Sequence, residues 1–267
     1  MPAPFAGTTA LVTGASRGIG AALAAAFAAR GADLILTARD RAALEQAAAP
    51  LRQAGRRVEI LTEDLSDPAA PARLVAELEH RVLVVDHLVN NAGISTVGLA
   101  RNADPAAERA VLQVNAVTPV ELGIRLLPGM VARRRGGILN VASTAAFQAM
   151  PWVTAYAATK ALLLTWSQGV HAELHGTGVR CTVICPGPVD TEFFERNRQG
   201  RPPRLTMVTP DRVARVALRA YERDRSLAIT GHLARLGAWA TRLGPRAFAA
   251  RVAEGYARPG GLGRKLA

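Results

Sequence analysis

Three side chains near the middle of the chain have the types and spacing needed to move a proton. Ser143, Tyr156 and Lys160 contribute a hydroxyl, a phenol and an ammonium, and the last two are four residues apart in an Ala-rich run. A helix there would project both side chains from one face. A phenol has a pKa of about 10 in water, and a nearby cation favours the phenolate. The pattern predicts that Tyr156 exchanges a proton, that Lys160 lowers its pKa, and that Ser143 donates a hydrogen bond to the reacting oxygen.

The lysine at position 160 is unusual in this composition. Of the 33 basic residues, 31 are Arg, and only Lys160 and Lys265 are Lys. Arg carries a permanent charge on a planar fork, whereas Lys carries a compact ammonium with three rotatable donors. This choice favours a chemical role over the alternative, in which Tyr156 and Lys160 are a surface pair on an ordinary helix.

Apolar runs of strand length alternate with helical segments along most of the chain. The predicted strands are 8–14, 34–39, 58–65, 86–93, 136–143 and 179–187. The predicted helices are 21–30, 41–54, 67–81, 104–132 with an interruption near Pro119, 154–175 and 210–223. Strands that are apolar throughout and alternate with helices indicate a parallel sheet covered on both faces. We therefore expect an α/β fold with a doubly wound parallel sheet of the Rossmann type, in one catalytic domain (1–231).

Glycine and arginine residues near the first two predicted strands suit a dinucleotide. The segment 13–20, TGASRGIG, lies between a strand and a helix, where backbone N–H groups can receive a pyrophosphate. About twenty residues further on, where an acidic residue would bind the ribose hydroxyls of NAD, the chain has Ala38 and Arg39. Arg39 and Arg17 could clamp the 2′-phosphate of NADP(H), which is therefore preferred over NAD(H). Asp40 argues against this preference, but it also suits the N-cap of the next helix.

Polar and small residues also end the next two predicted strands. Asp64 and Leu65 follow the third strand, where they could hold the edge of an adenine. Asn91, Ala92 and Gly93 follow the fourth, where small residues let the chain pass close to a cofactor. Ligands of doubly wound sheets bind at the carboxyl ends of the strands, so these motifs predict a single site.

Taken together, the motifs resemble those of the short-chain dehydrogenase/reductase family. The resemblance extends from about residue 8 to 230 and keeps the family's order. In chain order the matching segments are TGASRGIG (13–20), NNAG (90–93), Asn115, Ser143, YAATK (156–160) and PGPVDT (186–191).

The resemblance implies a role for each matching residue. Asn115, Ser143, Tyr156 and Lys160 match the family's catalytic tetrad. Tyr156 would pass a proton to a carbonyl oxygen held by Ser143 as hydride leaves the nicotinamide. Lys160 would also bind the nicotinamide ribose, and Asn115 would order a water that continues the proton path. The expected cofactor-binding residues are Gly14, Ser16, Arg17, Gly18, Ile19, Gly20, Arg39, Asp64, Leu65, Asn91, Ala92, Gly93, Tyr156, Lys160, Pro186, Gly187, Val189 and Thr191.

The substrate side is predicted only in outline. Ala145, Phe147 and Trp152 flank the catalytic motifs and would line an apolar pocket. The loop that caps the substrate in the family is basic in this chain, with Arg196, Arg198, Arg201 and Arg204. This combination suits a hydrophobic carbonyl compound with an anionic group, such as an acyl thioester. The alternative is that these arginines are simply solvated.

The net charge of +12 comes from the C-terminal quarter of the chain. Residues 1–195 carry 17 basic and 17 acidic side chains, whereas residues 196–267 carry 16 and 4. Residues 232–267 are expected to form a basic amphipathic helical extension, and such helices can lie on anionic membranes. The interpretation that we favour is that the apolar face packs on the core or on a partner subunit.

Other candidate sites have simpler explanations. Cys181 and Cys185 lie too far apart on one predicted strand to bridge, which predicts reduced core thiols. His171 and His175 are four residues apart, but the Glu between them is misplaced for the zinc-protease pattern. The three arginines at 133–135 close a predicted helix, where cations are favoured. We therefore expect no metal site and no nucleic-acid partner.

These observations lead to one main prediction and two alternatives. The main prediction is an NADP(H)-dependent oxidoreductase that interconverts a carbonyl and a secondary alcohol, with a homodimer or homotetramer implied by the resemblance. A non-catalytic NADP(H)-binding scaffold or redox sensor is opposed by the complete tetrad. A membrane-peripheral reductase of lipid-like ketones, bound through 232–267, is the other alternative. The N-terminus has no signal-peptide pattern and no apolar run approaches about 18 residues, so we expect a cytoplasmic protein.

Overall fold

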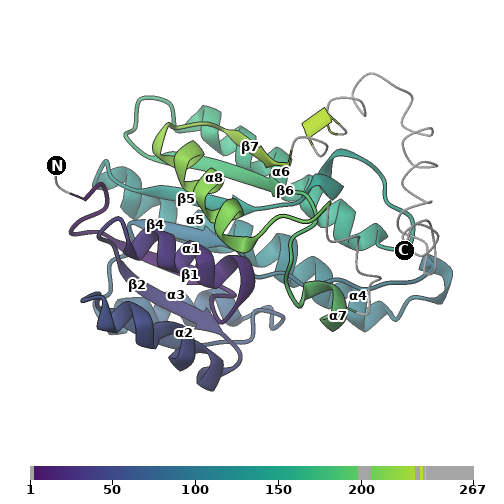
Figure 1. Ribbon diagram of the computed structural model, residues 1–267, viewed down its shortest axis with the longest axis horizontal. Helices are drawn as coiled ribbons and strands as arrows, with labels where there is room; N and C mark the ends of the chain where they lie inside the picture. The colour runs from purple at the N-terminus through teal and green to yellow at the C-terminus, as the bar shows by residue number, and fades with distance from the viewer. Residues whose placement is uncertain (1–2, 198–205, 232–234, 237, 239–267) are drawn as a thin grey trace.

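The apolar runs of the sequence form one parallel sheet. The structure, a computed structural model, describes residues 3–197, 206–231, 235–236 and 238. Within them, the strands pair in the order β3-β2-β1-β4-β5-β6-β7 (Figure 1). The strands are β1 (Thr9–Thr13), β2 (Asp33–Ala38), β3 (Val58–Thr62), β4 (His87–Asn90), β5 (Gly137–Val141), β6 (Arg180–Pro186) and β7 (Leu227–Thr230). The strand order changes direction between β1 and β4, which is the switch point where doubly wound sheets bind ligands.

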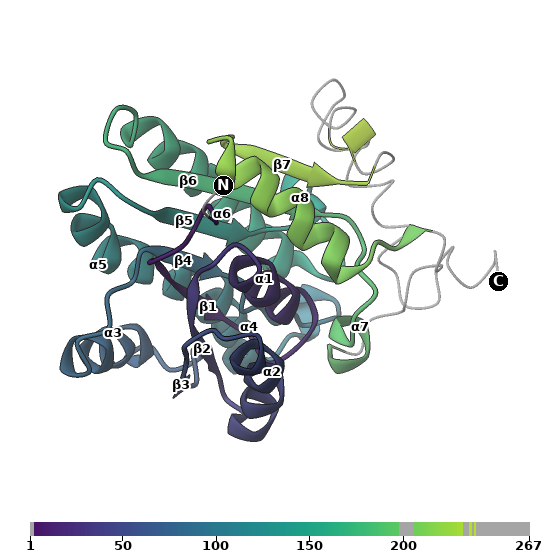
Figure 2. The same ribbon diagram turned by 60° about the vertical axis from the view of Figure 1, so that its left-hand side comes forward.

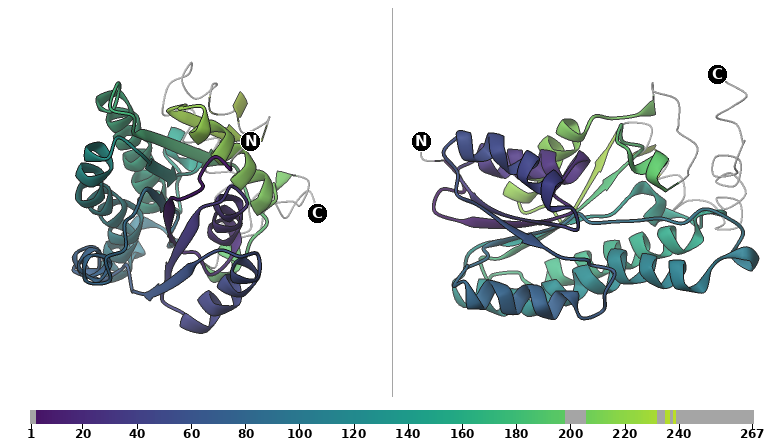
Figure 3. Two further views of the ribbon diagram at one scale, coloured as in Figure 1. Left: turned by 90° about the vertical axis from the view of Figure 1, so that its left-hand side faces the viewer. Right: turned by 90° about the horizontal axis from the view of Figure 1, so that it is seen from below.

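Helices cover both faces of this sheet, as Figure 2 and the right panel of Figure 3 show. One layer consists of α1 (Gly18–Ala28), α2 (Arg41–Gln53) and α8 (Pro210–Glu222). The opposite layer consists of α3 (Ala70–His80), α4 (Pro105–Leu112), α5 (Thr118–Ala132) and α6 (Thr154–Glu173). Short helical turns occur at η1 (Ala100–Asn102), η2 (Gln113–Val117), η3 (Thr144–Phe147) and α7 (Phe193–Arg196). The predicted α/β fold with a doubly wound parallel sheet is confirmed.

Alternate residues of each strand enter opposite layers of the core. In β1, Ala10 and Val12 pack with Phe27 of α1 in one hydrophobic cluster. Leu11 points the other way and packs with Leu122 of α5 in a second cluster. Because both faces are buried, the central strands read as continuous apolar runs in the sequence.

The long helix expected over 104–132 is interrupted just before the predicted position. Residues Gln113–Val117 form a π-helical turn between α4 and α5, in which the N–H of Thr118 donates to the carbonyl of Gln113, five residues earlier. Pro119 has no N–H to donate to the carbonyl of Asn115, four residues earlier, so an unbroken α-helix cannot form there. The interruption matters because it contains Asn115.

The last strand, β7, was not predicted. It has only four residues, Leu227–Thr230, and follows a charged segment, so its apolar run is too short to stand out. Its pairing with β6 depends on long-range contacts that the local sequence does not encode. Apart from residues 235, 236 and 238, the predicted extension 232–267 lies outside the described residues, as do the arginines at 198, 201 and 204.

Buried polar groups hold together the end of the sheet where the strands begin. The carboxylate of Asp86, which is 1% exposed, accepts hydrogen bonds from the Arg135 guanidinium, with Nη2 at 3.1 Å from each oxygen. The ring of His87 hydrogen-bonds the Tyr221 hydroxyl at 2.8 Å. Burial lowers the pKa of His87 to about 4, so its ring is neutral at pH 7. We call these four residues the amino-edge network.

One helical stretch among the described residues, Pro105–Ala132, is long and apolar enough to cross a membrane by length and composition alone. In this structure, its second part, α5, packs against α3, α6 and strands β4 and β5. These contacts are those of a core helix, which passes the same test of length and composition.

Candidate active site

The sheet brings the predicted motifs to one edge of the molecule. Because the strands are parallel, their carboxyl ends lie together. The glycine-rich turn (14–20) follows β1, residues 91–93 follow β4, Ser143 follows β5 and residues 187–191 follow β6. Segments that are far apart in the sequence therefore meet at the position expected for a cofactor and a substrate.

Tyr156 and Lys160 lie on α6 beside the end of β5. The Lys160 ammonium is 5.7 Å from the centroid of the Tyr156 ring and donates a hydrogen bond to the Val141 carbonyl at 2.9 Å. The Ser143 side chain lies close enough to the Tyr156 phenol to act on its pKa, in the direction that lowers it. The Ser143 oxygen also accepts a hydrogen bond from the Ala145 N–H at 3.1 Å, which fixes its rotamer. The structure thus brings together the three side chains that were expected to move a proton.

The electrostatics of the pair differ from the prediction. Burial raises the pKa of Tyr156 to about 12, although the Ser143 side chain acts in the opposite direction. Burial lowers the pKa of Lys160 to about 8. The expectation that Lys160 lowers the pKa of Tyr156 is not met in this structure, because burial of the phenol is the largest influence on that pKa and the groups that act on it do not include Lys160. Tyr156 is therefore protonated at neutral pH.

Asn115 connects two parts of the site. Its Oδ1 accepts a hydrogen bond from the Ile94 N–H at 2.9 Å, and its Nδ2 donates to the Ile94 carbonyl at 2.8 Å. Nδ2 also donates to the Thr159 hydroxyl of α6 at 3.2 Å. The side chain is completely buried. In this structure, Asn115 fixes the loop after β4 relative to the helix that carries Tyr156 and Lys160.

The glycine-rich turn has a shape that fits a dinucleotide. Gly14 and Gly18 have φ angles of +62° and +57°, which side chains rarely adopt. A Cβ on Gly20 would lie 2.2 Å from the carbonyl oxygen of Gly14, so the turn closes only without one. Asn91 ties the turn to β4, since its Nδ2 donates to the carbonyl of Gly14 at 3.1 Å. Together with a helix N-terminus, this compact turn can receive a pyrophosphate.

Arg17, in the glycine-rich turn, has an incompletely bonded side chain. Its Nε is buried and has no hydrogen-bond partner among the described residues. Its Nη1 donates to Glu192 at 2.9 Å, and its Nη2 lies 3.8 Å from the carboxylate of Asp40. An orphaned guanidinium nitrogen beside the expected adenosine position is consistent with an anionic ligand group.

Three other residues of the adenosine side are already engaged within the protein. Asp40 caps α2, as the alternative interpretation predicted, because its Oδ1 accepts the Ala43 N–H at 3.1 Å. Asp64 accepts hydrogen bonds from the N–H and the hydroxyl of Ser66. The carbonyl of Leu65 accepts the Thr118 hydroxyl at 3.1 Å.

The three predicted substrate residues have different environments. Ala145 is buried in η3, directly after Ser143. Phe147 packs partly against a small hydrophobic cluster behind the site that includes Cys185. Trp152 has a φ of +71°, an uncommon value for a bulky residue, and its carbonyl accepts the Gly98 N–H at 2.8 Å. The backbone on this side is thus held in a constrained conformation just before α6.

One residue beside the site was missed by sequence analysis. The ring of Phe193, in α7, lies 5.7 Å from that of Tyr156. Asn197 holds α7 in place, because its Oδ1 accepts the Ser95 N–H at 2.7 Å. The pair of phenylalanines after the PGPVDT motif was the available signal, since aromatic side chains there must either face the site or remain exposed.

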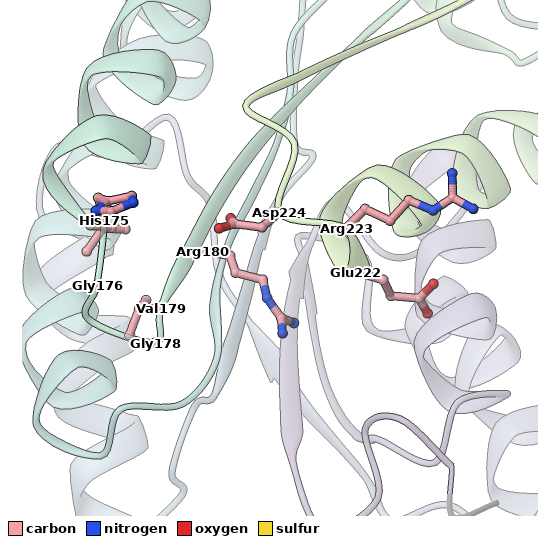
Figure 4. A pocket seen from close by; sticks show the side chains of 9 residues that line it. His175, Gly176, Gly178, Val179, Arg180, Glu222, Arg223 and Asp224 are labelled. Carbon is pink, nitrogen blue, oxygen red and sulfur yellow. The ribbon is translucent and has the colours of Figure 1, made fainter.

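A shallow polar pocket of about 470 Å³ lies elsewhere in the molecule. Figure 4 shows it between the start of β6 and the end of α8, where His175, Arg180 and Asp224 line it. The start of β6 is at the opposite end of the sheet from Tyr156. This pocket is therefore separate from the candidate active site.

Fold and site together define an oxidoreductase with a Rossmann-type sheet. A family model described as short chain dehydrogenase matches residues 8–202. The chain therefore belongs to the short-chain dehydrogenase/reductase family, as the motifs indicated.

Individual relatives extend this comparison. The chain is 33% identical over 217 residues to the ketoacyl reductase HetN of Nostoc sp., covering 81% of this chain and 76% of the relative. A short-chain dehydrogenase from Sphingobium yanoikuyae, solved in complex with NADPH, superposes with a TM-score of 0.79 at 31% identity, covering 88% of this chain and 93% of that one. A 3-oxoacyl (acyl-carrier-protein) reductase from Agrobacterium tumefaciens C58, solved with NADP bound, gives a TM-score of 0.76 at 29% identity, with coverage of 84% and 93%.

Proposed function

We propose that this protein is an NADPH-preferring reductase that converts a ketone on a hydrophobic substrate, such as a 3-oxoacyl thioester, into a secondary alcohol. The observation that carries the proposal is the arrangement of Ser143, Tyr156 and Lys160 at the carboxyl edge of the sheet. A scaffold or sensor without catalysis would not need a buried lysine beside a buried phenol, because burying an ammonium costs free energy.

In the proposed reaction, Tyr156 is the acid. Its pKa of about 12 keeps the phenol protonated at neutral pH, so it can donate to a carbonyl oxygen that the Ser143 hydroxyl also holds. Bound NADPH supplies the hydride. Lys160 is positioned to bind the nicotinamide ribose, and its pKa of about 8 suits an ammonium that can exchange a proton. Asn115 keeps α6 and the loop after β4 in register, so the reacting groups stay aligned.

The preference for NADPH is supported by residues at the end of β2. Ala38 stands where an acid would repel a 2′-phosphate, and Arg39 follows it. The fit of the turn to a dinucleotide and the orphaned Nε of Arg17 support an anionic ligand on this side. Two of the related structures hold NADPH or NADP.

The choice of substrate class is supported by two kinds of evidence. Apolar and aromatic side chains, Ala145, Trp152 and Phe193, lie close to Tyr156 in sequence or in space. The relatives named above include a ketoacyl reductase and a 3-oxoacyl reductase. A 3-oxoacyl thioester combines an apolar chain with a reducible ketone, and its carrier is anionic.

Nicotinamide absorbance with an acetoacetyl thioester tests the proposal. We expect oxidation of NADPH to be faster than that of NADH at equal concentrations. Arg39→Ala should raise the KM for NADPH about tenfold, since a charge-assisted hydrogen bond contributes about 1.5–3 kcal/mol, and should leave the KM for NADH unchanged. Arg41→Ala, which removes an exposed arginine paired with Glu45, is the matched control. Faster turnover with NADH would contradict the cofactor assignment, and tight NADPH binding without turnover of any ketone would favour a sensor.

We also propose that the protein is a homo-oligomer, as family membership suggests. Large apolar side chains remain exposed on helices of one layer: Ile124 of α5 is 61% exposed, Leu162 of α6 48% and Leu112 of α4 45%. A second copy of the chain could cover them. Sedimentation velocity at micromolar concentration should give a mass at least twice the chain mass of 28.1 kDa. Ile124→Glu should shift the protein toward the monomer, that is, toward 28.1 kDa. A wild-type protein that sediments as a monomer would contradict the proposal.

A further inference from the structure

Glu192 connects the glycine-rich turn with the segment that covers Tyr156. Its carboxylate accepts a hydrogen bond from Arg17 at 2.9 Å and lies 3.2 Å from the Nε of Arg196. These two guanidinium groups lower the pKa of Glu192, so the carboxylate stays charged at neutral pH. The residue directly before it, Thr191, lies close enough to the turn that a Cβ on Gly18 would be 3.2 Å from its methyl group.

The arginine held by Glu192 has unused hydrogen-bonding capacity. Arg17 has a buried Nε without a partner among the described residues, while its terminal nitrogens face Glu192 and the more distant Asp40. The Glu192 side chain is 65% exposed and that of Asp40 56%, so both ion pairs are weakened by water. A phosphate dianion offers more charge and more acceptor oxygens than a carboxylate. Glu192 is therefore a weak partner that a stronger anion can replace.

We propose that Glu192 is a specificity-determining residue that competes with the 2′-phosphate of NADP(H) for Arg17. NADPH must displace Glu192 from Arg17 to bind fully, whereas NADH, which lacks this phosphate, leaves the pair intact. Glu192 therefore reduces the discrimination between the two cofactors below the value that Arg17 and Arg39 would give alone. The inference rests on the proposed function, since it requires that NADP(H) binds beside the glycine-rich turn.

The Arg17–Glu192 ion pair also couples cofactor binding to the surroundings of Tyr156. Glu192 immediately precedes α7, whose Phe193 ring lies against that of Tyr156. Asn197 holds the other end of this short helix through the Ser95 N–H. When the phosphate takes Arg17, α7 loses its tie to the turn but keeps its tie to the loop after β4.

Glu192→Gln tests the competition, because the amide keeps the shape and removes the charge. Dissociation constants for NADPH and NADH are measured by isothermal titration calorimetry on the full-length protein. We expect NADPH to bind about three- to fivefold more tightly to Glu192→Gln, the upper range for an exposed ion pair, and NADH to change less than twofold. Glu77→Gln is the matched control, since Glu77 also pairs with an arginine on an exposed helix face but lies on α3.

Arg17→Met and the double variant show whether Glu192 acts through Arg17. In the Arg17→Met background, Glu192→Gln should no longer change NADPH affinity, because a coupled pair is non-additive. The proposal is overturned if Glu192→Gln leaves NADPH affinity unchanged, if it improves NADH equally, or if its effect persists without Arg17. Each of these results leaves the proposed reductase intact, whereas failure of the wild-type protein to bind either nucleotide would overturn both.

Discussion

Replacing Tyr156 with Phe is expected to lower kcat by about a thousandfold, which is the middle of the range for a general acid. The substitution removes only the hydroxyl, which is the proposed proton donor and whose pKa is raised by burial. Binding of NADPH should change by less than twofold, because the ring is retained. Steady-state kinetics and calorimetry on the same preparation measure the two quantities.

The other described phenol with a shifted pKa provides the control for this result. Tyr221 is fully buried in the amino-edge network and hydrogen-bonds His87 at 2.8 Å. Tyr221→Phe should lower the free energy of unfolding by about 1 kcal/mol, as a lost buried hydrogen bond does, and leave kcat unchanged. If both variants lose the same activity, then stability rather than proton transfer explains the effect of Tyr156→Phe.

Replacing Lys160 with Met is expected to lower kcat at least a hundredfold without lowering stability at pH 7. The ammonium is 3% exposed, and burial lowers its pKa from 10.5 to about 8. A shift of this size corresponds to about 3 kcal/mol of unfavourable charge burial at pH values below 8. Met removes this unfavourable free energy and fills a similar volume. Loss of the hydrogen bond to the Val141 carbonyl offsets part of the resulting stabilisation.

The pH dependence of stability separates this explanation from a simple packing effect. Between pH 8 and 10.5, the unfolded chain keeps the Lys160 proton and the folded protein loses it, so wild-type stability rises with pH in this window. The difference in unfolding free energy between Lys160→Met and wild type should therefore shrink from pH 7 to pH 10 in urea titrations. A variant that is several kcal/mol less stable than wild type at pH 7 would show that the buried ammonium is structural.

Local patterns predicted the fold well where elements are long or bounded by clear signals. The alternation of apolar runs and Ala-rich segments predicted β1 through β6 and their parallel arrangement, because burial on both faces leaves few polar residues in a strand. Asp40 was recognisable as an N-cap from its position alone. The π turn at Gln113–Val117 was located only approximately, since a Pro indicates a break without specifying how the backbone adjusts.

The sequence predicted where the candidate catalytic residues lie relative to one another, but not their electrostatics. Residue type and spacing placed Tyr156 and Lys160 on one helix face, and the structure has them there. The direction of the Tyr156 pKa shift depends on how deeply the ring is buried, which no local pattern reports. Phe193 and Glu192 approach the site only through long-range folding of the segment after β6, so their contacts could not be inferred from spacing.

The amino-edge network separates residues that stabilise the fold from residues of the candidate active site, which affects how the protein can acquire new substrates. Asp86, His87, Arg135 and Tyr221 lie where the strands begin, whereas Ser143, Tyr156 and the glycine-rich turn lie where strands end. Substitutions at sites this far apart contribute nearly additively to stability. Loops at the carboxyl edge of the sheet can therefore be exchanged to admit new substrates while the amino-edge network keeps the protein folded. Substitutions that create new activities commonly lower stability, and stabilising substitutions at the amino edge can compensate for that loss.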